Sequence, residues 1–567
     1  MTRRQLARFD DVLLLGIMTV LAGCGLIYEY LLSHYAGRVL GAMDSAIFTM
    51  IGLMIVSMGL GAFAARSVRC AFSGFAVLEL LVAIIGSVAI LLTAAIIGLT
   101  QVLPAVLADT FGLPQELAPS GGVLARLQKL AQYLPYVWGV ILGWFIGMEI
   151  PLIARVRQDL ASEHLKHNAG TIYGADYIGA GIGAAIWVLW MLTINTQTAA
   201  AITASVNLIA GLAFLWRYWG HIRRPKLLAG LHGIAAILLM VLAWQGPDWQ
   251  HQFNNLLYQD KVVFNQDTRF QKIVLTERQL GTQSAPVYSL YLNGRLQFSS
   301  QDEAVYHSFL VHPAMAASAR QEQVLIIGGG DGLALKHVLQ WHPQRVTLMD
   351  LDEQLVRTFK EPEAVFSRRI ATAVSELTQN SLKDPRVELR YADAFNGADE
   401  LISEGRFYDV IVVDLPDPSH PDINKVYSDQ FYAKLNQLLS ADGVIAVQST
   451  SPYHARKAFI SVGKTLTAAG FRGVEQYHHN VPSFGQWGWS IATKSGLKAS
   501  QRLARLQEWP SIDETWLTPQ LALAAFAFPG DFYRDKQEVK VNRFGSNQLY
   551  QYHQQAWSRG QGLNFNE

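Results

Sequence analysis

The sequence predicts an N-terminal all-α bundle of membrane-spanning helices followed by a C-terminal α/β domain built on a parallel sheet. The chain has 567 residues, of which 50% are hydrophobic and only 16% are charged, and this balance favours a mixture of two unlike parts. Apolar stretches of roughly 20 residues, the length that crosses about 30 Å of hydrocarbon, recur up to Trp244. Beyond Trp249 short apolar strands alternate with helical patterns, which favours a parallel sheet.

Seven candidate spans, each nearly free of charge in its middle, indicate a multi-pass membrane protein. They are about 11–32, 46–65, 74–98, 132–154, 176–195, 198–216 and 227–245. We expect the first span to be retained, because it is too long for the apolar core of a signal peptide and lacks a matched small-residue cleavage site. The lipid bilayer is therefore an expected partner.

Four regions are expected along the chain. They are a transmembrane domain at 1–246, a β-module with a first helix at 247–318, a parallel-sheet domain at 319–500 and a C-terminal extension at 501–567 that shows no motif with an interpretable function. The two cysteines, Cys24 and Cys70, both fall in the membrane region, so the soluble region has no disulfide framework and no cysteine for a zinc site. A formal charge of +1 gives no electrostatic case for nucleic acid as a partner.

The orientation in the membrane involves a conflict. Basic residues cluster in four segments: Arg3, Arg4 and Arg8; Arg66 and Arg69; Arg155, Arg157 and Lys166; and Arg217, Arg223, Arg224 and Lys226. The positive-inside rule places all four segments in the cytoplasm, and seven crossings then leave the soluble domain outside. The apolar stretch between residues 74 and 111, which Pro104 interrupts, has room for an extra or re-entrant segment, and an eighth crossing there would reverse this. We expect the cytoplasmic side, where a nucleoside cofactor is available, and the other orientation stays open.

Three acids inside or near the spans are functional candidates, because an ionisable group at membrane depth costs several kcal/mol unless it is paired or hydrated. They are Glu29, Glu149 and Asp176. Glu149 and Asp176 lie close to span ends, where a carboxylate can reach the headgroups. Glu29 lies deeper and is the better candidate.

The soluble region begins with short β-rich runs between Lys261 and Phe298, including an Asn293-Gly294 pair that is typical of a hairpin. A helix is expected from Glu303 to Ala317. The expected strands of the main sheet are 324–327, 345–349, 387–391 and 410–413, with a helix at 333–340 after the first. Each strand is followed by an acid, and the carboxyl ends of parallel strands line one binding crevice.

The turn from Gly328 to Gly332 contains an acid, Asp331, and lacks the lysine and Ser/Thr of a phosphate-binding loop. Glycines allow the backbone to approach a ligand closely. Asp350 follows about 20 residues later, where a carboxylate can accept hydrogen bonds from ribose hydroxyls. These features predict a site for a nucleoside without phosphates, and the acids along the rim favour a cationic substrate.

With these motifs the soluble region resembles the spermidine synthase family of aminopropyltransferases. The resemblance runs from about Phe270 to Gly488 through these elements: Phe270-Gln271, Asn293 to Gln297, Asp302-Glu303, Tyr306-His307, His312-Pro313, Gly328 to Gly332, Asp350 to Asp352, Asp393-Ala394 and Asp414 to Pro418. The membrane region is similar to the multi-pass segment fused to some bacterial members, through Tyr28-Glu29, Gly147 to Pro151 and Tyr173 to Asp176.

The resemblance implies a Rossmann-like domain of the S-adenosylmethionine methyltransferase type. It implies decarboxylated S-adenosylmethionine as a co-substrate and a diamine, usually putrescine, as the acceptor. The products would be spermidine and methylthioadenosine. No prosthetic group and no metal are implied. The expected location is the inner membrane of a bacterial cell, and a homodimer is left open.

The resemblance also implies residue roles. Asp414 would take a proton from the attacking amine, which Asp417, Tyr306 and His307 would bind. The donor would be bound by Gln271, Gly328, Gly330, Asp331, Asp350 and Asp393, with Asp350 on the ribose, Asp393 on the adenine amino group, and Asp331 with Gln271 on the aminopropyl end. Simpler interpretations stay open: Tyr306 and His307 as helix packing, Gln271 as a solvated strand residue, and Asp417 before Pro418 as a turn former.

The sequence departs from the family pattern at Ser308, Leu333 and Lys336-His337, and a later aromatic loop has Phe484 but lacks a tyrosine that often contacts the diamine. The acceptor side is therefore expected to be altered. Two rival functions remain: a methyltransferase, which has no need for the second acid of the Asp414/Asp417 pair, and a polyamine transporter or sensor that uses the acids of the membrane region.

Overall fold

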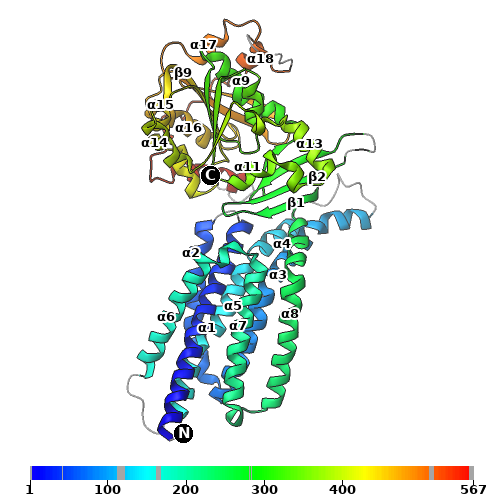
Figure 1. Ribbon diagram of the computed structural model, residues 1–567, viewed down its shortest axis with the longest axis vertical. Coiled ribbons are helices and arrows are strands. Elements are labelled where there is room, and N and C mark those ends of the chain that lie inside the picture. The colour runs from blue at the N-terminus through cyan, green and yellow to red at the C-terminus, as the bar shows by residue number, and fades with distance from the viewer. Residues whose placement is uncertain are drawn as a thin grey trace. The chain divides into compact units, whose positions relative to one another are not determined.

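The computed structural model describes residues 3–40, 43–111, 122–160, 168–258, 260–279, 281, 284–509, 512 and 516–560. The chain divides into two compact units, Met1–Gln259 and Asp260–Glu567, the first made of long helices and the second built on two sheets (Figure 1). Of the basic residues used above, Lys166 lies outside the described residues, as do the side chains of Arg3, Arg4 and Arg8. The finer division at 247–318, 319–500 and 501–567 stays a prediction.

The first unit is a helix bundle. Its helices are α1 (Arg3–Leu40), α2 (Met43–Ala64), α3 (Ala71–Thr110), α4 (Gly122–Gln132), α5 (Leu134–Leu160), α6 (Asn168–Leu189), α7 (Thr196–Arg217) and α8 (Pro225–Asn255). Among the described residues, seven stretches are long and apolar enough to cross a membrane: Phe9–Leu40, Ala46–Ser67, Ala71–Pro104, Leu134–Leu160, Gly170–Thr193, Thr196–Arg217 and Pro225–Asn255. Each predicted span falls on one of them, so the prediction of seven long apolar helices is confirmed.

The suggestion of an extra segment between residues 74 and 111 is wrong for the described part of the chain. α3 continues through Pro104 to Thr110 as one helix. Proline is tolerated in apolar helices because neighbouring groups can satisfy the carbonyl that it leaves free. The helix that follows, α4, has only 11 residues and carries Arg126 and Lys129, so it adds no further long apolar helix.

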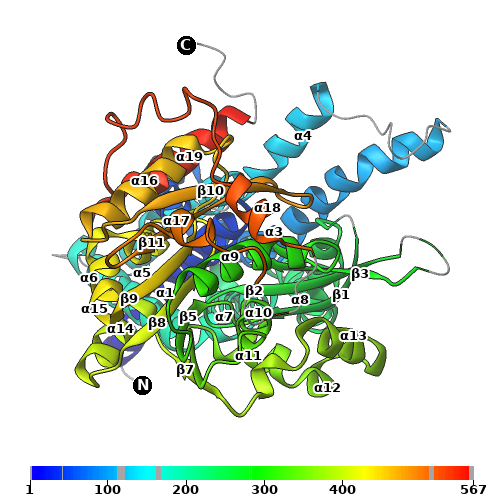
Figure 2. The same ribbon diagram turned by 90° about the horizontal axis from the view of Figure 1, so that it is seen from above.

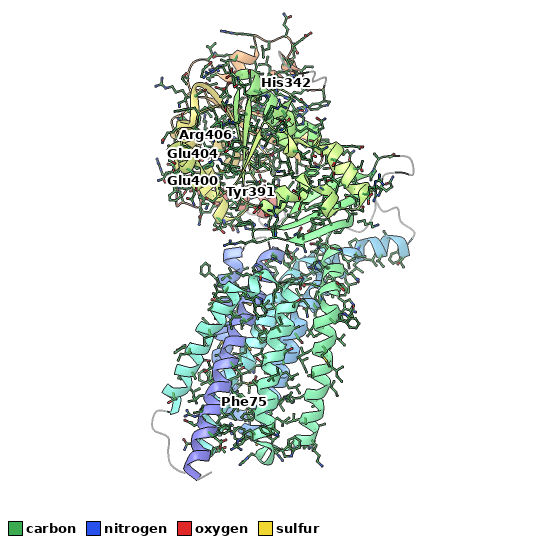
Figure 3. All side chains as sticks on the ribbon, viewed as in Figure 1. Phe75, His342, Tyr391, Glu400, Glu404 and Arg406 are labelled. Carbon is green, nitrogen blue, oxygen red and sulfur yellow. The ribbon has the colours of Figure 1, made fainter. Side chains whose placement is uncertain are left out.

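Small residues and aromatic rings hold the bundle together. A side chain at Gly179 or Gly183 of α6 would collide with the backbone of α1 at Thr19 or Gly23, so glycine permits the close approach of these two helices. At the end of the bundle where α1 begins, Phe75 of α3 is fully buried (Figure 3), and its ring lies 4.6 Å from that of Phe214 of α7.

The second unit begins with a four-stranded antiparallel sheet in the order β1-β2-β3-β4. Its strands are β1 (Lys261–Asp267), β2 (Lys272–Arg278), β3 (Val287–Leu292) and β4 (Arg295–Ser299). Asn293 and Gly294 connect β3 to β4 with φ angles of 51° and 78°, the left-handed geometry that a two-residue hairpin requires. The predicted hairpin is confirmed.

The main sheet has seven strands in the order β10-β11-β9-β8-β5-β6-β7. They are β5 (Gln323–Gly328), β6 (Arg345–Asp350), β7 (Val387–Tyr391), β8 (Tyr408–Asp414), β9 (Leu439–Gln448), β10 (Glu475–Val481) and β11 (Gly485–Thr493). Strands β5 to β9 pair in parallel, as predicted, but β10 and β11 form an antiparallel hairpin that pairs with β9. The sheet is therefore mixed, and the prediction of a purely parallel sheet is corrected at this edge.

Helices cover both faces of this sheet. They are α9 (Glu303–Ala317), α10 (Leu333–Leu339), α11 (Glu353–Lys360), α12 (Pro362–Val365), α13 (Arg368–Thr378), α14 (Ala394–Ser403), α15 (Asp429–Leu438), α16 (Arg456–Ala468), α17 (Ala499–Leu503), α18 (Pro519–Ala524) and α19 (Gln548–Gly560). Residues of α9, α10, α11 and α13 share one core, whereas residues of α14, α15, α16 and α19 share the other (Figure 2). Helices on both faces are typical of a Rossmann-like sheet with its crevice at the strands' carboxyl ends.

Candidate active site

The glycine turn brings the end of β5 against the end of β8. Gly328 pairs with Asp414 in the sheet, and the Gly329 N–H donates to the Asp414 carbonyl oxygen at 3.1 Å. Gly328 and Gly329 have φ angles of 79° and 64°, and a side chain at Gly328 would collide with the Asp414 backbone. Only glycine tolerates both conditions, so this turn holds the Asp414 backbone in place.

The Asp414 carboxylate meets two side chains of α9. The Tyr306 hydroxyl donates to Asp414 Oδ1 at 2.9 Å, and His307 Nε2 lies 3.8 Å from Asp414 Oδ2. Burial raises the pKa of Asp414 above its ordinary value, although the charge of His307 and the Tyr306 hydrogen bond oppose the shift. A buried carboxylate with a raised pKa is a stronger base than one in water. The structure thus brings together three of the predicted site residues.

His307 is held in turn by Glu303, one helical turn earlier. His307 Nδ1 lies 2.8 Å from the Glu303 carbonyl oxygen and 3.1 Å from Glu303 Oε2. Glu303 Oε1 accepts a hydrogen bond from Lys336 Nζ at 2.6 Å. Burial lowers the pKa of His307, but its hydrogen bond to Glu303 and the charge of Asp414 outweigh that effect and raise it overall. Glu303 therefore fixes the ring that faces Asp414.

The expected donor side contains two half-buried acids. Asp350 at the end of β6 accepts hydrogen bonds from the Gly330 N–H at 3.1 Å and the Asp352 N–H at 2.8 Å. Asp331 accepts from the Leu333 N–H at 2.9 Å. Burial is the main cause that raises the pKa of both Asp331 and Asp350 to about 6. These acids titrate close to neutrality.

Two predicted donor residues have other partners. Gln271 Nε2 donates to Asp352 Oδ2 at 2.9 Å, which places it beside the β6 end. Asp393 caps α14 by accepting from the Phe395 and Asn396 N–H groups at 3.2 and 3.3 Å. Its second oxygen pairs with Lys425 Nζ at 2.8 Å. The assignments of Gln271 and Asp393 to the donor stay predictions.

Comparison with known proteins identifies the family. Residues 303–503 match the spermine/spermidine synthase domain. The chain is 64% identical over 559 residues to the polyamine aminopropyltransferase of Shewanella oneidensis, which covers 99% of this chain and 97% of that protein. The chain belongs to the polyamine aminopropyltransferase family. It is also 33% identical to polyamine aminopropyltransferase 1 of Streptomyces coelicolor, over 97% of this chain and 95% of that one.

Two solved structures are similar to part of the chain. A spermidine synthase in complex with the transition state analogue AdoDATO matches with a TM-score of 0.42 and 21% identity, over 49% of this chain and 89% of that one. The spermidine synthase of Thermotoga maritima matches with a TM-score of 0.40 at 21% identity. The family resemblance inferred from the sequence is confirmed by the relatives, and the protein is an enzyme that transfers aminopropyl groups.

The second acid of the aminopropyltransferase motif, Asp417, has partners that the sequence did not indicate. Gln448 Nε2 donates to Asp417 Oδ1 at 3.2 Å, the Thr450 hydroxyl donates to Oδ2 at 3.2 Å, and His553 Nε2 lies 3.1 Å from Oδ2. Burial raises the pKa of Asp417, but the hydrogen bonds from His553 and Gln448 and the charge of Arg295 outweigh it and hold the pKa below its ordinary value. Asp417 is thus an ionised acid and more than a turn former.

Four residues that contact or influence the predicted His307 and Asp417 were not predicted from the sequence. They are Arg295, Glu303, Gln448 and His553. Glu303 and Arg295 lie inside motifs that carried the resemblance, so a signal existed for them. His553 belongs to the C-terminal extension, 136 residues after Asp417, and nothing in its neighbouring sequence indicates this contact.

Proposed function

We propose that this aminopropyltransferase uses decarboxylated S-adenosylmethionine as donor and putrescine as acceptor, giving spermidine and methylthioadenosine. The observation that carries the proposal is the buried Asp414 carboxylate, held by Tyr306 beside the glycine turn. The donor carries a sulfonium and an ammonium, and putrescine is a dication. Asp331, Asp350, Asp414 and Asp417, which lie at or shortly after the carboxyl ends of β5, β6 and β8, attract such molecules.

The proposed reaction is an in-line displacement. An alkylammonium with a pKa near ~10 is no nucleophile, so Asp414 first accepts one of its protons. The freed nitrogen lone pair then forms a bond to the donor carbon next to sulfur. The carbon–sulfur bond breaks, and its electron pair neutralises the sulfonium to give the thioether of methylthioadenosine. Tyr306 and His307 orient the Asp414 carboxylate, and positioning of the two reactants is worth up to ~7–11 kcal/mol.

The donor is expected to lie along the ends of β5 and β6. In this proposal Asp350 binds the ribose, Gly328 and Gly330 let the backbone approach the nucleoside, and Asp331 with Gln271 binds the aminopropyl end. Asp393 binds the adenine amino group. The co-substrate brings its own activated carbon, so the residues described here bind and orient it and no prosthetic group is required.

We predict that donor affinity falls as the pH drops through about 6. The pKa values of Asp331 and Asp350 are both about 6, so above that pH both acids are ionised and attract the cationic donor. Below it they are protonated and the attraction is lost. The KM for the donor, measured from pH 5 to 8, should rise steeply below pH 6, while an Asp331→Asn variant should have a raised KM at pH 8 and a flatter profile. A donor KM that is constant across this range contradicts the assignment.

The acceptor is tested with a panel of diamines of different length. We expect kcat/KM for putrescine to exceed that for the shorter and longer diamines, because Asp414 and Asp417 are fixed at one separation by β8 and its loop. A higher kcat/KM for another diamine would overturn putrescine as acceptor and leave the transferase activity in place. Absence of transfer to every amine would overturn the proposed reaction itself.

We also propose that the seven apolar helices span a bacterial cell membrane and that the enzyme domain lies on the cytoplasmic side, where its donor is found. Three of the basic residues that favour the opposite orientation have structural partners. Arg157 pairs with Asp11 at 2.5 Å, Arg217 pairs with Asp10 at 2.6 Å, and Arg155 donates to the carbonyl oxygens of Ala65 and Val68. Helix packing therefore accounts for these charges without a topological signal.

The side of the membrane is tested with a thiol reagent that does not cross membranes. A Ser403→Cys variant, made in a chain whose Cys24 and Cys70 are replaced by alanine, presents one thiol in the second unit. In intact spheroplasts we expect no labelling of this thiol until the membrane is permeabilised. Labelling before permeabilisation would place the enzyme domain outside the cytoplasm.

A further inference from the structure

A polar cluster lies inside the helix bundle. Tyr28 of α1, Glu79 of α3 and Glu149 of α5 are 1%, 0% and 1% exposed. At a rise of about 1.5 Å per residue, Glu79 lies about 12 Å from the start of α3 and Glu149 about 16 Å from the end of α5. Both helix ends belong to the end of the bundle where α1 begins (Figure 1). In an inserted bundle these acids sit near the middle of the hydrocarbon.

The members of the cluster interact with one another. Asn207 Nδ2 of α7 donates to Glu79 Oε2 at 2.6 Å. The carboxyl groups of Glu79 and Glu149 interact electrostatically, and the Tyr28 hydroxyl interacts with both. The cluster is therefore formed where α1, α3, α5 and α7 meet. Glu29, which the sequence favoured, is only half-buried, and Asp176 is half-buried and interacts with Glu149.

The cluster has more acceptors than donors. Among the described residues, Glu79 Oε1, Glu149 Oε2 and the Tyr28 hydroxyl have no hydrogen-bond partner. His232 of α8 has its Nδ1 2.9 Å from the Leu228 carbonyl oxygen, and a carbonyl only accepts, so Nδ1 carries the proton and Nε2 of the neutral ring is an acceptor. Among the described residues this Nε2 has no hydrogen-bond partner. It lies beside Gly211, as Glu79 does. A ligand that supplies donors and positive charge would satisfy these atoms.

We propose that the bundle contains a cation-binding site between Glu79 and Glu149 and that its ligand is a primary ammonium group of a polyamine. An alkylammonium has three N–H donors, which matches the three oxygens that lack partners. Its charge offsets a carboxylate that would otherwise be costly at this depth. A metal ion fits less well, since no group of three His, Cys, Asp or Glu side chains with metal-binding geometry occurs among the described residues.

The choice of a polyamine rests on the proposed function, because the second unit of the same chain acts on amines of this kind. The site gives the membrane region a role of its own in binding the substrate or the product of the enzyme domain. It also supplies residues for the alternative that the sequence left open, in which the membrane region transports or senses polyamines.

The test is equilibrium dialysis of radiolabelled spermidine against the full chain in detergent, in an Asp417→Asn background that weakens the catalytic acceptor site. We expect one remaining site per chain, and at least tenfold weaker binding when Glu79→Gln and Glu149→Gln are added. Tyr28→Phe should weaken binding severalfold without a change of charge. Glu29→Gln, a half-buried acid of the same bundle, is the matched control and should bind as the parent does. Gel filtration and the melting temperature identify any variant that fails to fold.

Two results overturn the proposal: no remaining site in the Asp417→Asn parent, or equal binding when Glu79 and Glu149 are both replaced in a folded protein. Absence of a site in the parent would instead indicate that Glu79 and Glu149 only exchange protons. Turnover of the wild type with putrescine in the same preparation separates this proposal from the proposed function. Active enzyme without a second amine site contradicts the bundle site alone, whereas a second site in inactive enzyme contradicts the proposed reaction alone.

A second, independent observation concerns α19 and the acceptor side of the active site. Asn542, just before α19, is fully buried, and its Nδ2 donates to the carbonyl oxygens of Asn424 and Tyr427 at 3.0 and 3.1 Å. Asn424 Oδ1 accepts from the Tyr550 N–H at 3.3 Å. These bonds fasten α19 to the segment that follows the Asp414 to Pro418 loop, and they bring His553 to Asp417.

The contacts around Asp417 limit how it can bind an amine. A carboxylate has about four acceptor sites. Thr450 and His553 occupy the two on Oδ2, and Gln448 occupies one on Oδ1. One site on Oδ1 is left for a substrate N–H, and its direction is fixed by the groups on the other three. The geometry assigns to His553 the role of a positioning residue for the acceptor amine.

This role, which rests on the proposed function, predicts a split between kinetic constants. In His553→Ala the KM for the diamine should rise about tenfold, while kcat and the KM for the donor change less than twofold. His553→Gln, whose amide can still donate, should recover most of the loss. Gln554→Ala, on the exposed side of α19, is the control and should match the wild type. Equal increases of both KM values, or no change of either, would overturn the assignment, whereas an inactive wild type would instead contradict the proposed function.

Discussion

Replacement of Asp414 by asparagine should lower kcat by about 10²- to 10⁴-fold, the usual contribution of a general base. Asparagine has nearly the same shape and can still accept a hydrogen bond from Tyr306, so donor affinity should fall far less than kcat. The defect lies in proton removal from the attacking ammonium. Steady-state kinetics with saturating diamine, together with a donor binding assay, measure both effects.

The pH profile of this variant makes the prediction sharper. Without a base, the reaction depends on amine that is already neutral, and its fraction rises about tenfold per pH unit below a pKa of ~10. The rate of Asp414→Asn should therefore climb steeply from pH 7 to 9, while the wild-type rate stays much flatter. Asp399→Asn, at an exposed acid of α14 that pairs with Lys434, is the control. If Asp414→Asn retains more than a tenth of the wild-type rate at pH 7, another group accepts the proton.

Replacement of Glu303 by glutamine should have the largest effect on stability. Glu303 is 6% exposed and Lys336 is 9% exposed, so loss of the carboxylate leaves a buried ammonium without its counter-charge. Removal of one partner of a buried ion pair lowers the free energy of unfolding by about 3–5 kcal/mol. The variant should also lose activity, because His307 loses the charged Glu303 Oε2 and keeps only the backbone carbonyl of residue 303 as an acceptor. Urea unfolding of the full chain, followed by transferase activity and tryptophan fluorescence, measures the shift.

Two comparisons separate this effect from a general loss of charge. Glu277 pairs with Arg369, which is 60% exposed. Glu277→Gln should therefore lower the free energy of unfolding by at most about 1 kcal/mol. A double variant, Glu303→Gln with Lys336→Met, removes the uncompensated charge and should recover part of the loss. If Glu303→Gln is no less stable than Glu277→Gln, the buried network is not a stabilising element.

The Glu303 contribution has a defined pH dependence. Burial raises the pKa of Glu303, but hydrogen bonds from His307 and His337 and the charge of Lys336 outweigh it and hold the pKa well below its ordinary value. A depressed carboxyl pKa adds stability above the pKa of the unfolded chain, and that stability is lost as the pH falls toward the folded pKa. The difference between wild type and Glu303→Gln should therefore be complete at pH 7 and shrink below about pH 4.

Much of the fold could be predicted because it depends on local patterns. Length and hydropathy alone define a helix that can cross a bilayer, so all seven long helices were found. The strands β5 to β8 were found because each apolar run ends in an acid or a glycine turn. Strands β9, β10 and β11 were not predicted, and β10 in particular is mostly polar and lacks the apolar run of a buried strand.

The site was predictable where it depends on sheet topology. Asp331, Asp350 and Asp414 follow parallel strands and therefore meet at one edge. The contact of His553 with Asp417 depends on how the C-terminal extension packs, which no local pattern specifies. Glu79 differs from both cases: it is a single acid inside the predicted span 74–98, so the signal was present in the sequence and only its pairing with Glu149 required the structure.

Isotope tracing shows whether this chain moves an aminopropyl group from a sulfonium donor to a diamine. Purified full-length protein is incubated with putrescine and decarboxylated S-adenosylmethionine that carries deuterium only in the aminopropyl group, and the products are separated by mass spectrometry. We predict that all of the transferred deuterium appears in spermidine and none in methylthioadenosine. The two products should form in equal amounts. Deuterium that stays with the intact donor, or methylated putrescine in place of spermidine, would contradict this transfer.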